Sequence, residues 1–366
     1  MHENKNLLNH STIVVVNLQD KDSWNKYIKR FPIAQQDIYF TSDYYQLYEH
    51  GEEYSAFCFI FEKNENLAVF PFIKKEINVL GYNLDKKYYD IKGAYGYNGI
   101  LSNITDKEIL LEFHNSFTNY CVDNNVIASF IRLHPLLKNE NLSSTFNELI
   151  KNRDVVAIDL TKTYLEIWNS EYSTKNRNMI RKAYKLGHKI QVLSDPSIKD
   201  IDKFIEVYHH SMDLANAEKF YYFNKSYFIN TFKYLKDYTY LFNVLDENET
   251  VVCSSIFYHY GDYFHYHLSG RNCLVDNSVN NFMIDKAVEF AQQKGAKILH
   301  LGGGRTSSPD DSLFLFKKNF SKLLLPFYYE KKIYNNAVYV DIINQWEKNH
   351  PKKKEIYNRF LLKYRM

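Results

Sequence analysis

The fold is decided by three stretches: YFHYHLSG (263–270), NNFMIDKAVEFAQQKGAKILHLGGG (280–304) and SLFLFKKNFS (312–321). The first is rich in aromatic residues, which is typical of a strand. The second predicts a helix that ends at Gly295, followed by an apolar strand that ends in glycines. The third has apolar residues at helical spacing and predicts a short amphipathic helix. This alternation of strands and helices indicates an α/β or α+β unit.

The first half of the chain shows the same order of elements. Two β-rich runs separated by a polar turn predict a hairpin over 54–75, as residues 238–260 do in the second half. In both halves the hairpin precedes a helix and then a strand. Further elements are expected as a helix over 107–125, a long polar helix over 164–186 and two late strands over 323–333 and 337–343. The repeat predicts two units joined by the polar stretch 138–153.

Length and composition fit a globular protein of two domains. The chain has 366 residues, of which 45% are apolar and 24% charged, so a sizeable core can form. The net charge of +3 is too small to indicate nucleic-acid binding by itself, and we expect no DNA partner. No apolar run approaches the ~20 residues of a membrane span, and the N-terminus lacks the pattern of an export signal. We therefore expect a cytoplasmic protein.

The cysteines indicate buried thiols rather than disulfides or a metal site, because no CxxC pair is present. They are Cys58, Cys121, Cys253 and Cys273. His265 and His267 alternate along one predicted strand and share a face, but no Cys/His cluster supplies the further ligands that zinc needs. The sequence therefore predicts no metal.

Four stretches carry a resemblance to a known family: DIKGAYGYNGIL (90–101), FIRLHPLL (130–137), STKNRNMIRKAYKLGHKIQV (173–192) and the run within 266–321. In this order they resemble the Fem-like branch of the GNAT acyltransferase superfamily. That branch comprises bacterial peptidoglycan-bridge aminoacyltransferases and their relatives in surface-polysaccharide gene clusters. The resemblance implies two tandem GNAT-like domains with mixed, mainly antiparallel sheets flanked by helices. We expect an acceptor-side domain over 1–150, an acyltransferase domain over 151–345 and a basic amphipathic tail over 346–366.

Lys317 is the first candidate for the catalytic site. In Fem-like enzymes the lysine of an F-K-x-x-F segment steadies the negative charge of the transition state, and the resemblance implies that role for Lys317. The segment itself predicts a helix with Leu313, Phe316 and Phe320 inward and Lys317 beside that apolar face. The alternative is a solvated surface lysine.

Two neighbouring segments supply further candidates. Gly303 and Gly304 end an apolar strand and allow a backbone or ligand to approach closely, although a plain turn is the alternative. The motif is not a Walker loop, since no Gly-Lys-Ser/Thr follows. The resemblance implies that His267 and Ser269 border the acyl-transfer channel, whereas plain strand packing would also explain them.

The first domain supplies the candidates for the acceptor. His134 stands before Pro135, where the family often has an aspartate, and could deprotonate an ammonium nucleophile. Arg132, two positions earlier, is expected on the same face and could clamp a carboxylate or phosphate. The resemblance implies that the loop with Tyr95 and Tyr97 borders an acceptor groove. Alternatively, His134 is a structural histidine and Arg132 belongs to a surface ion pair. The two tyrosines would then serve only in aromatic packing.

The donor stays open between an acyl-CoA and an aminoacyl-tRNA. Arg177 and Arg181 lie four residues apart on one helix face and could bind the phosphates of a nucleotide sugar or of tRNA, although basic faces are often only solvated. The glycine-rich coenzyme-A signature is absent from RNCLVDNSVNN (271–281). This departure favours the tRNA donor of the Fem-like branch.

The expected function is acyl or aminoacyl transfer to an amine of a cell-envelope precursor, either an amino sugar of a surface polysaccharide or a peptidoglycan peptide. One alternative is acetyl-CoA-dependent N-acetylation of a nucleotide-linked amino sugar. A second is a non-catalytic module that binds RNA or a membrane surface. The basic tail could touch anionic lipid headgroups of the inner membrane.

Overall fold

The computed structural model describes residues 11–49, 51–272 and 274–366, which form two compact units. Unit 1 consists of the residues up to Gln35, Tyr39–Asn152 and Phe327–Met366. Unit 2 consists of Gln36–Ile38 and Arg153–Pro326. The mixed α/β architecture with mainly antiparallel strands confirms the predicted fold class.

These units correct the boundaries expected from the sequence. Residues after Pro326 return to unit 1 because β13 (Leu324–Ile333) pairs antiparallel with β6 (Val126–Arg132). The stretch expected as a linker contains the start of a twelve-residue strand, β7 (Glu148–Asp159). Sequence patterns locate strands but do not reveal which strand each one pairs with, so the second boundary was misplaced.

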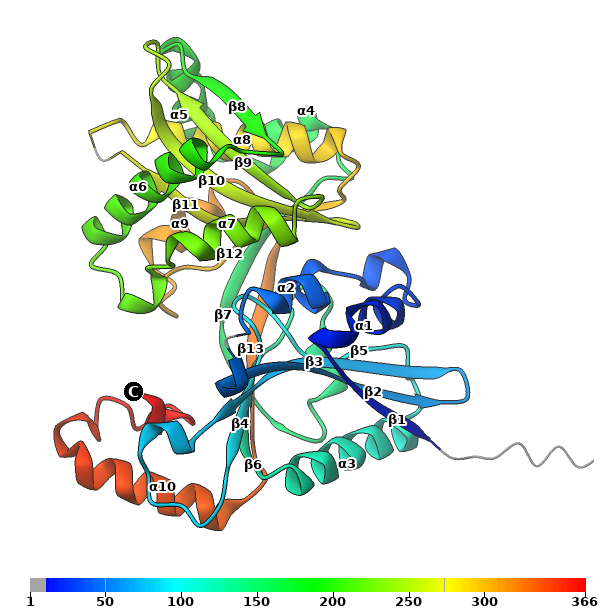
Figure 1. Cartoon of the computed structure of the whole chain (residues 1–366). Helices are drawn as coiled ribbons and strands as arrows, with labels where there is room; N and C mark the ends of the chain where they lie inside the picture. The colour runs from blue at the N-terminus through cyan, green and yellow to red at the C-terminus, as the bar shows by residue number, and fades with distance from the viewer. Residues whose placement is uncertain (1–10, 50, 273) are drawn as a thin grey trace, which may run out of the picture. The chain divides into compact units, whose positions relative to one another are not determined.

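The sheet of unit 1 has the order β1-β2-β3-β4-β6-β13, with β5 paired to β3 (Figure 1). Its strands are β1 (Thr12–Asn17), β2 (Tyr54–Lys63), β3 (Asn66–Glu76), β4 (Tyr89–Lys92), β5 (Leu101–Ser102), β6 and β13. The β2–β3 hairpin is the one that the sequence predicts. β4 and β6 pair in parallel, and the other pairs are antiparallel.

Helices cover the sheet of unit 1. α3 (Lys107–Asp123) begins at its N-cap Asp106 and packs Phe113 and Phe117 against Phe59. α1 (Lys21–Ile28) and α2 (Ser42–Gln46) bury Trp24 and Tyr45, whose rings lie 5.3 Å apart. α10 (Asn336–Asn349) buries Ile342 and Trp346 in a further cluster. Each of these elements therefore contributes an apolar face to the core of unit 1.

The C-terminal segment packs into unit 1 and is not the separate amphipathic tail expected over 346–366. Tyr364 is 2% exposed, and its hydroxyl donates to Asp90 at 2.9 Å. Lys363 forms an ion pair with Glu347 at 2.7 Å. Residues 337–343, expected as a strand, lie within α10, because Asn335 caps this segment and Ile342 and Trp346 recur four residues apart.

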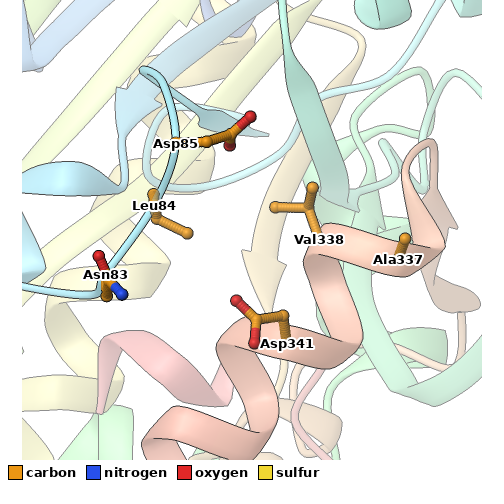
Figure 2. A pocket seen from close by; sticks show the side chains of 6 residues that line it. All are labelled: Asn83, Leu84, Asp85, Ala337, Val338 and Asp341. Carbon is orange, nitrogen blue, oxygen red and sulfur yellow. The ribbon is translucent and has the colours of Figure 1, made fainter.

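A hollow in unit 1 lies between residues 83–85 and α10 (Figure 2). Its volume is about 400 Å³, and its lining consists of Asn83, Leu84, Asp85, Ala337, Val338 and Asp341. Gln345 of α10 ties the two segments together through hydrogen bonds with the backbone of Asn83. None of the site residues expected from the sequence belongs to this lining, so we assign no chemistry to it.

The sheet of unit 2 has the order β7-β12-β11-β10-β9-β8. Its remaining strands are β8 (Lys189–Leu193), β9 (Thr239–Leu245), β10 (Val251–Tyr260), β11 (Tyr263–Arg271) and β12 (Ile298–Gly302). β11 and β12 pair in parallel and the other pairs are antiparallel. The β9–β10 hairpin is again the predicted one.

Helices cover both faces of this sheet. α5 (Thr174–Lys185) and α8 (Ser278–Gln293) contribute Ile180, Met283 and Ala287 to one large apolar core. α6 (Ile198–Leu214) and α7 (Lys225–Tyr234) pack Phe204 against Phe228, with ring centroids 5.2 Å apart. α9 (Ser312–Lys318) closes the unit before β13.

The long helix expected over 164–186 is broken in the structure. α4 (Tyr164–Glu166) leads into a π-helical turn (Ile167–Glu171), and α5 begins after its own N-cap, Ser173. Tyr172 has the extended backbone (φ −68°, ψ 130°) that ends the first segment. The polar composition was compatible with one helix, but the serine cap starts a second one.

The structure also bears on the cysteines and on membrane-spanning helices. Cys58, Cys121 and Cys253 are buried free thiols as predicted, whereas Cys273 lies outside the described residues. The expectation about an export signal also concerns residues outside them. Within the described part of the chain, every helix is too short or too polar to cross a bilayer.

Candidate active site

The parallel strands β11 and β12 of unit 2 separate part-way along their length. They pair from Tyr263↔Ile298 to His265↔His300, and β11 then continues to Arg271. β12 ends at Gly302 after an irregularity in its pairing with β7. The unpaired strand ends leave backbone groups available, and in open α/β sheets ligands bind at the carboxyl ends of such strands.

The glycines after β12 allow side chains to pack directly on the backbone. A Cβ on Gly303 would lie 2.8 Å from Cδ of Arg153, and one on Gly304 would collide with the carboxylate of Asp311. Arg153 donates from Nη1 to the carbonyl of Gly304 at 2.5 Å. The groups that approach Gly303 and Gly304 closely are neighbouring side chains of the chain itself, so the approach of a ligand stays a prediction.

Lys317 lies on the buried face of α9. The sequence predicts Leu313, Phe316 and Phe320 as the inward face, whereas the buried residues of this segment are Phe314, Lys317 and Phe320. The inward face is therefore rotated by about one residue, and the lysine belongs to it. The sequence predicts Lys317 beside the apolar face. The structure places it within that face, since Lys317 is only 7% exposed.

The ammonium of Lys317 is held in place by the strand end. Nζ donates to the carbonyl of Gly303 at 2.8 Å and lies 5.7 Å from the ring centroid of Tyr266 on β11. Burial lowers the pKa of Lys317 to about 7, assisted by repulsion from Arg153 and opposed by attraction to Asp311. The charge of this side chain therefore changes near neutral pH.

Asp311 organises the loop between β12 and α9. One oxygen caps α9 by accepting from the N–H groups of Leu313 and Phe314, and the other accepts from those of Arg305 and Thr306. Burial alone would raise the pKa of Asp311, but these N–H donors hold it down to about 2. The carboxylate is thus charged at neutral pH and helps to keep the neighbouring ammonium protonated.

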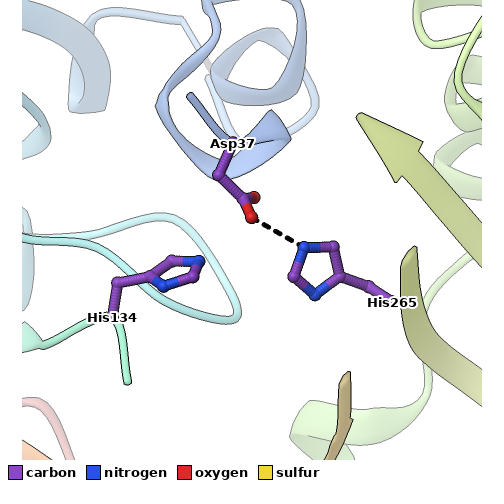
Figure 3. Close-up of side chains that lie close together, drawn as sticks. All are labelled: Asp37, His134 and His265. Atoms are coloured by element: carbon purple, nitrogen blue, oxygen red, sulfur yellow. Dashed lines mark hydrogen bonds and ion pairs between the residues drawn. The ribbon is translucent and has the colours of Figure 1, made fainter. Parts of the chain in front are cut away.

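A buried chain of polar side chains, which the sequence analysis missed, lies at the last paired rung of β11 and β12. Nε2 of His265 lies 2.7 Å from Oδ2 of Asp37, a pair drawn in Figure 3. Nδ1 of His265 lies 3.4 Å from Nδ1 of His300. The three side chains are at most 2% exposed. A carboxylate only accepts, so His265 donates to it through Nε2 and presents Nδ1 towards His300. Asp37 stands 228 positions before His265, so no sequence spacing could reveal the pair.

His267 and Ser269 lie on β11 beyond that rung, as expected. Nε2 of His267 is 3.2 Å from the hydroxyl of Tyr227, and its ring centroid is 4.4 Å from that of Tyr258. Burial lowers the pKa of His267 to about 3, so the ring is neutral at physiological pH. Ser269 accepts from the hydroxyl of Ser255 at 2.7 Å. Both side chains are engaged in strand packing, which was the alternative interpretation.

Three of the acceptor-side candidates converge in unit 1. The ring centroid of Tyr97 lies 5.6 Å from that of His134 and 5.2 Å from that of Phe327, and Arg132 lies 5.5 Å over the same Phe327 ring. Tyr95 contributes its carbonyl, which accepts from the hydroxyl of Tyr44 at 2.5 Å.

His134 lies two residues after the end of β6 at Arg132. Its ring still lies beside Tyr97, which contacts the Phe327 ring that Arg132 covers. The imidazole is completely buried, and its Nδ1 accepts from the N–H of Leu137 at 3.3 Å. It stabilises the turn after the strand.

Arg177 supports the chain where the expected long helix is broken. Its Nη1 donates to the carbonyls of Trp168 at 3.1 Å and Tyr172 at 2.5 Å. Arg181 stays exposed, donates to Asn178 at 3.1 Å and lies over the Trp168 ring. The guanidinium of Arg177 therefore satisfies free carbonyl groups at a helix end, which leaves it less able to bind a phosphate. For Arg181, phosphate binding stays a prediction.

Comparisons with known proteins give fold similarity without sequence similarity. No family model and no curated protein matches the chain. FemX is similar over 90% of this chain and 98% of its own, with a TM-score of 0.67 and 14% identity. The C-terminal domain of a putative lysylphosphatidylglycerol synthetase from Agrobacterium fabrum follows with a TM-score of 0.55 and 12% identity, covering 88% of this chain and 94% of that one.

A tandem GNAT protein from the clavulanic acid biosynthesis pathway is also similar, with a TM-score of 0.53 and 5% identity over 89% of this chain and 99% of its own. Agreement over nearly the full length of these proteins, at identities of 5–14%, concerns the backbone arrangement. Together with the two units, it establishes that the chain has the fold shared by FemX and this tandem GNAT protein.

Proposed function

We propose that the protein transfers an acyl or aminoacyl group to an amine of a cell-envelope precursor, with Lys317 stabilising the negative charge of the transition state. The observation that carries the proposal is the buried ammonium of Lys317, bound to the carbonyl of Gly303 where β11 and β12 have separated. The sequence resemblance to the Fem-like branch supports the same role for this residue.

The chemistry requires a fixed positive charge in a place that excludes water. Attack of an amine on the donor carbonyl places negative charge on the carbonyl oxygen, and a preorganised ammonium of low exposure stabilises it more strongly than a solvated one. Lys317 satisfies both conditions, because its 7% exposure and its bond to Gly303 limit movement.

The amine must also lose a proton during the reaction. We propose His265 for this task, because Asp37 orients its ring and stabilises the imidazolium that forms. His134, the candidate from the sequence, uses Nδ1 within its own turn.

The proteins of similar fold suggest the class of acceptor. Lysylphosphatidylglycerol synthetases, by their name, make an aminoacylated membrane lipid, and the sequence resemblance implies an amino sugar or a peptidoglycan peptide. An aminoacyl-tRNA is the proposed donor, because 271–281 lacks the glycines of a coenzyme-A loop. The second candidate is acetyl-CoA-dependent N-acetylation, which the tandem GNAT similarity favours.

A transfer assay tests the proposal and separates the two donors. Purified protein is incubated with radiolabelled aminoacyl-tRNA or acetyl-CoA and with a nucleotide-linked amino sugar or a nucleotide-linked muramyl peptide as acceptor. We expect labelled product with one donor and its loss in Lys317→Met. Lys318→Met is the matched control, because Lys318 is the exposed neighbour on the same helix. Absence of product with every pair, or equal rates for Lys317→Met and wild type, would contradict the proposal.

A further inference from the structure

Residues 171–173 of unit 2, at the end of the π-helical turn, contact the segment 319–322 that directly follows α9. The N–H of Ser173 donates to the carbonyl of Asn319 at 2.9 Å, and the hydroxyl of Ser173 donates to Oδ1 of Asn319 at 2.8 Å. Asn319 stands two positions after Lys317. We call residues 171–173 the α9 seat, because they fix the end of the helix that carries this lysine.

The other two residues of the α9 seat contact the next positions of the same segment. Oε2 of Glu171 accepts from the N–H of Lys322 at 3.0 Å, and Oε1 forms an ion pair with Lys162 at 2.6 Å. The rings of Tyr172 and Phe320 meet edge to face with centroids 5.5 Å apart, and both side chains are at most 2% exposed. Three consecutive residues of the seat therefore hold three residues that follow α9.

The α9 seat is anchored to the rest of unit 2 independently of α9. Arg177 donates to the carbonyls of Trp168 and Tyr172, which fixes the backbone of the π-helical turn. Burial raises the pKa of Tyr172, and the nearby carboxylate of Asp285 adds to this effect. Asp285 is fully buried on α8 and accepts from the hydroxyl of Tyr164 at 2.9 Å. The seat is therefore a rigid support for the shorter helix.

The hydroxyl of Ser173 serves two helices at once. It accepts from the N–H of Asn176 at 3.1 Å as the N-cap of α5, and it donates to Oδ1 of Asn319. A hydroxyl has one proton and two lone pairs, so both bonds can exist together. Nδ2 of Asn319 donates in turn to the carbonyl of Leu315 at 2.9 Å. One hydroxyl thus links the start of α5 to the last turn of α9.

The position of α9 depends on contacts at its two ends. It has seven residues, and a helix of this length is not stable by itself in water. Asp311 caps its first turn, the α9 seat holds its last, and Nζ of Lys317 donates to the carbonyl of Gly303 at 2.8 Å. A charge that stabilises a transition state must be held close to its productive position.

We propose that Ser173 is a positioning residue for Lys317, because its hydroxyl fixes the end of α9 and so keeps the ammonium against the carbonyl of Gly303. This statement rests on the proposed function, in which Lys317 stabilises the transition state. Ser173 acts through Asn319 and α9 and touches no reacting atom. The remaining contacts of the α9 seat should preserve the fold when the hydroxyl alone is removed.

Ser173→Ala in the transfer assay is the first test. The variant keeps the backbone bond to Asn319 but loses both bonds of the hydroxyl, so kcat should fall about tenfold while KM changes less than about twofold. Ser173→Thr restores a hydroxyl and should recover most of the activity. The matched control is Ser197→Ala. Ser197 is the serine N-cap of α6, and within the described part of the chain its hydroxyl bonds only to Asp200.

The pKa of Lys317 is a second readout, which a general loss of stability would leave unchanged. Burial lowers it to about 7, opposed by Asp311 and assisted by Arg153. In Ser173→Ala a loosened α9 admits water to the ammonium, so the pKa should rise towards the ordinary value of lysine. NMR titration of protein with isotope-labelled lysine measures it without substrate, and the Lys317→Arg variant identifies the signal. The alkaline limb of the kcat profile should move to higher pH by the same amount.

The outcomes separate this inference from the proposed function. Equal kcat and an equal pKa of Lys317 in Ser173→Ala and Ser197→Ala overturn the positioning role, even where Lys317→Met abolishes transfer. A raised pKa of Lys317 in Ser173→Ala supports the positioning role. If Lys317→Met nevertheless transferred at the rate of the wild type, the proposed function alone would fail.

Discussion

Lys75 of unit 1 and Lys317 of unit 2 are both buried, and the two lysines have different surroundings. Lys75 and Lys317 are 6% and 7% exposed, and burial lowers the pKa of both, to about 6 and about 7. Lys317 donates to the carbonyl of Gly303 and is attracted by Asp311. Lys75 lies over an aromatic ring among other cations.

The surroundings of a buried ammonium determine which function it can serve. A buried ammonium that the chain itself holds in place is preorganised and can stabilise charge that develops during a reaction. A buried ammonium surrounded by like charges raises the free energy of the folded protein until an anion arrives. This difference supports the catalytic role that we propose for Lys317 of unit 2.

The largest expected effect on the rate comes from removing the ammonium of Lys317. Lys317→Met should lower kcat about 10²–10³-fold, the usual loss when one group that stabilises an oxyanion is deleted. Single-turnover rates with saturating donor and acceptor measure the chemical step. Lys75→Met should lower the same rate much less, because Lys75 lies among other cations of unit 1 and not at the separated ends of β11 and β12. If both variants lose the same amount of activity, the two lysines do not differ as described.

The pH dependence should distinguish the lysines next. Lys317 must be protonated to stabilise negative charge, so with a pKa of about 7 the rate should fall about tenfold per pH unit above neutrality. Lys317→Arg keeps its charge because the guanidinium stays protonated, and it should extend activity to higher pH. The measurement is kcat between pH 6 and 9. A profile of the wild type that stays flat to pH 9 would argue against a role of the ammonium.

A smaller effect on the rate is expected at the partner of His265. Asp37→Asn keeps the size and one oxygen of the side chain but removes the charge that stabilises an imidazolium, so we expect kcat to fall about 10–100-fold. His259→Gln, on the neighbouring strand β10, is the control and should keep most activity. An unchanged rate for Asp37→Asn would exclude His265 as the base.

The smallest expected effect concerns stability. Lys75→Met removes an amine whose protonation is disfavoured by burial and by the neighbouring cations, and it should raise the melting temperature at pH 6 by roughly 2 °C. Between pH 6 and about 10 the unfolded wild type binds more protons at this residue than the folded protein, so the wild type should gain stability with rising pH. The variant should lack this contribution in melting curves recorded at pH 6 and 9. A larger rise in melting temperature between pH 6 and 9 in the variant than in the wild type would contradict this prediction.

The sequence alone determined the elements whose apolar pattern is local. The hairpin over 54–75, the helix over 107–125 and the amphipathic segment with Lys317 follow from residues a few positions apart, because side-chain periodicity reflects which face each element buries. The resemblance to Fem-like enzymes pointed to Lys317, and its burial agrees with a place in the interior.

Tertiary structure alone decided which distant residues meet. Asp37 reaches His265 across 228 positions, and Lys75, Lys92 and Arg132 come together only because β3, β4 and β6 are neighbours in the sheet. The return of β13 to β6 also moved the C-terminal residues into unit 1. Strand pairing is set by hydrogen bonds and packing between remote segments, and local sequence carries little information about either.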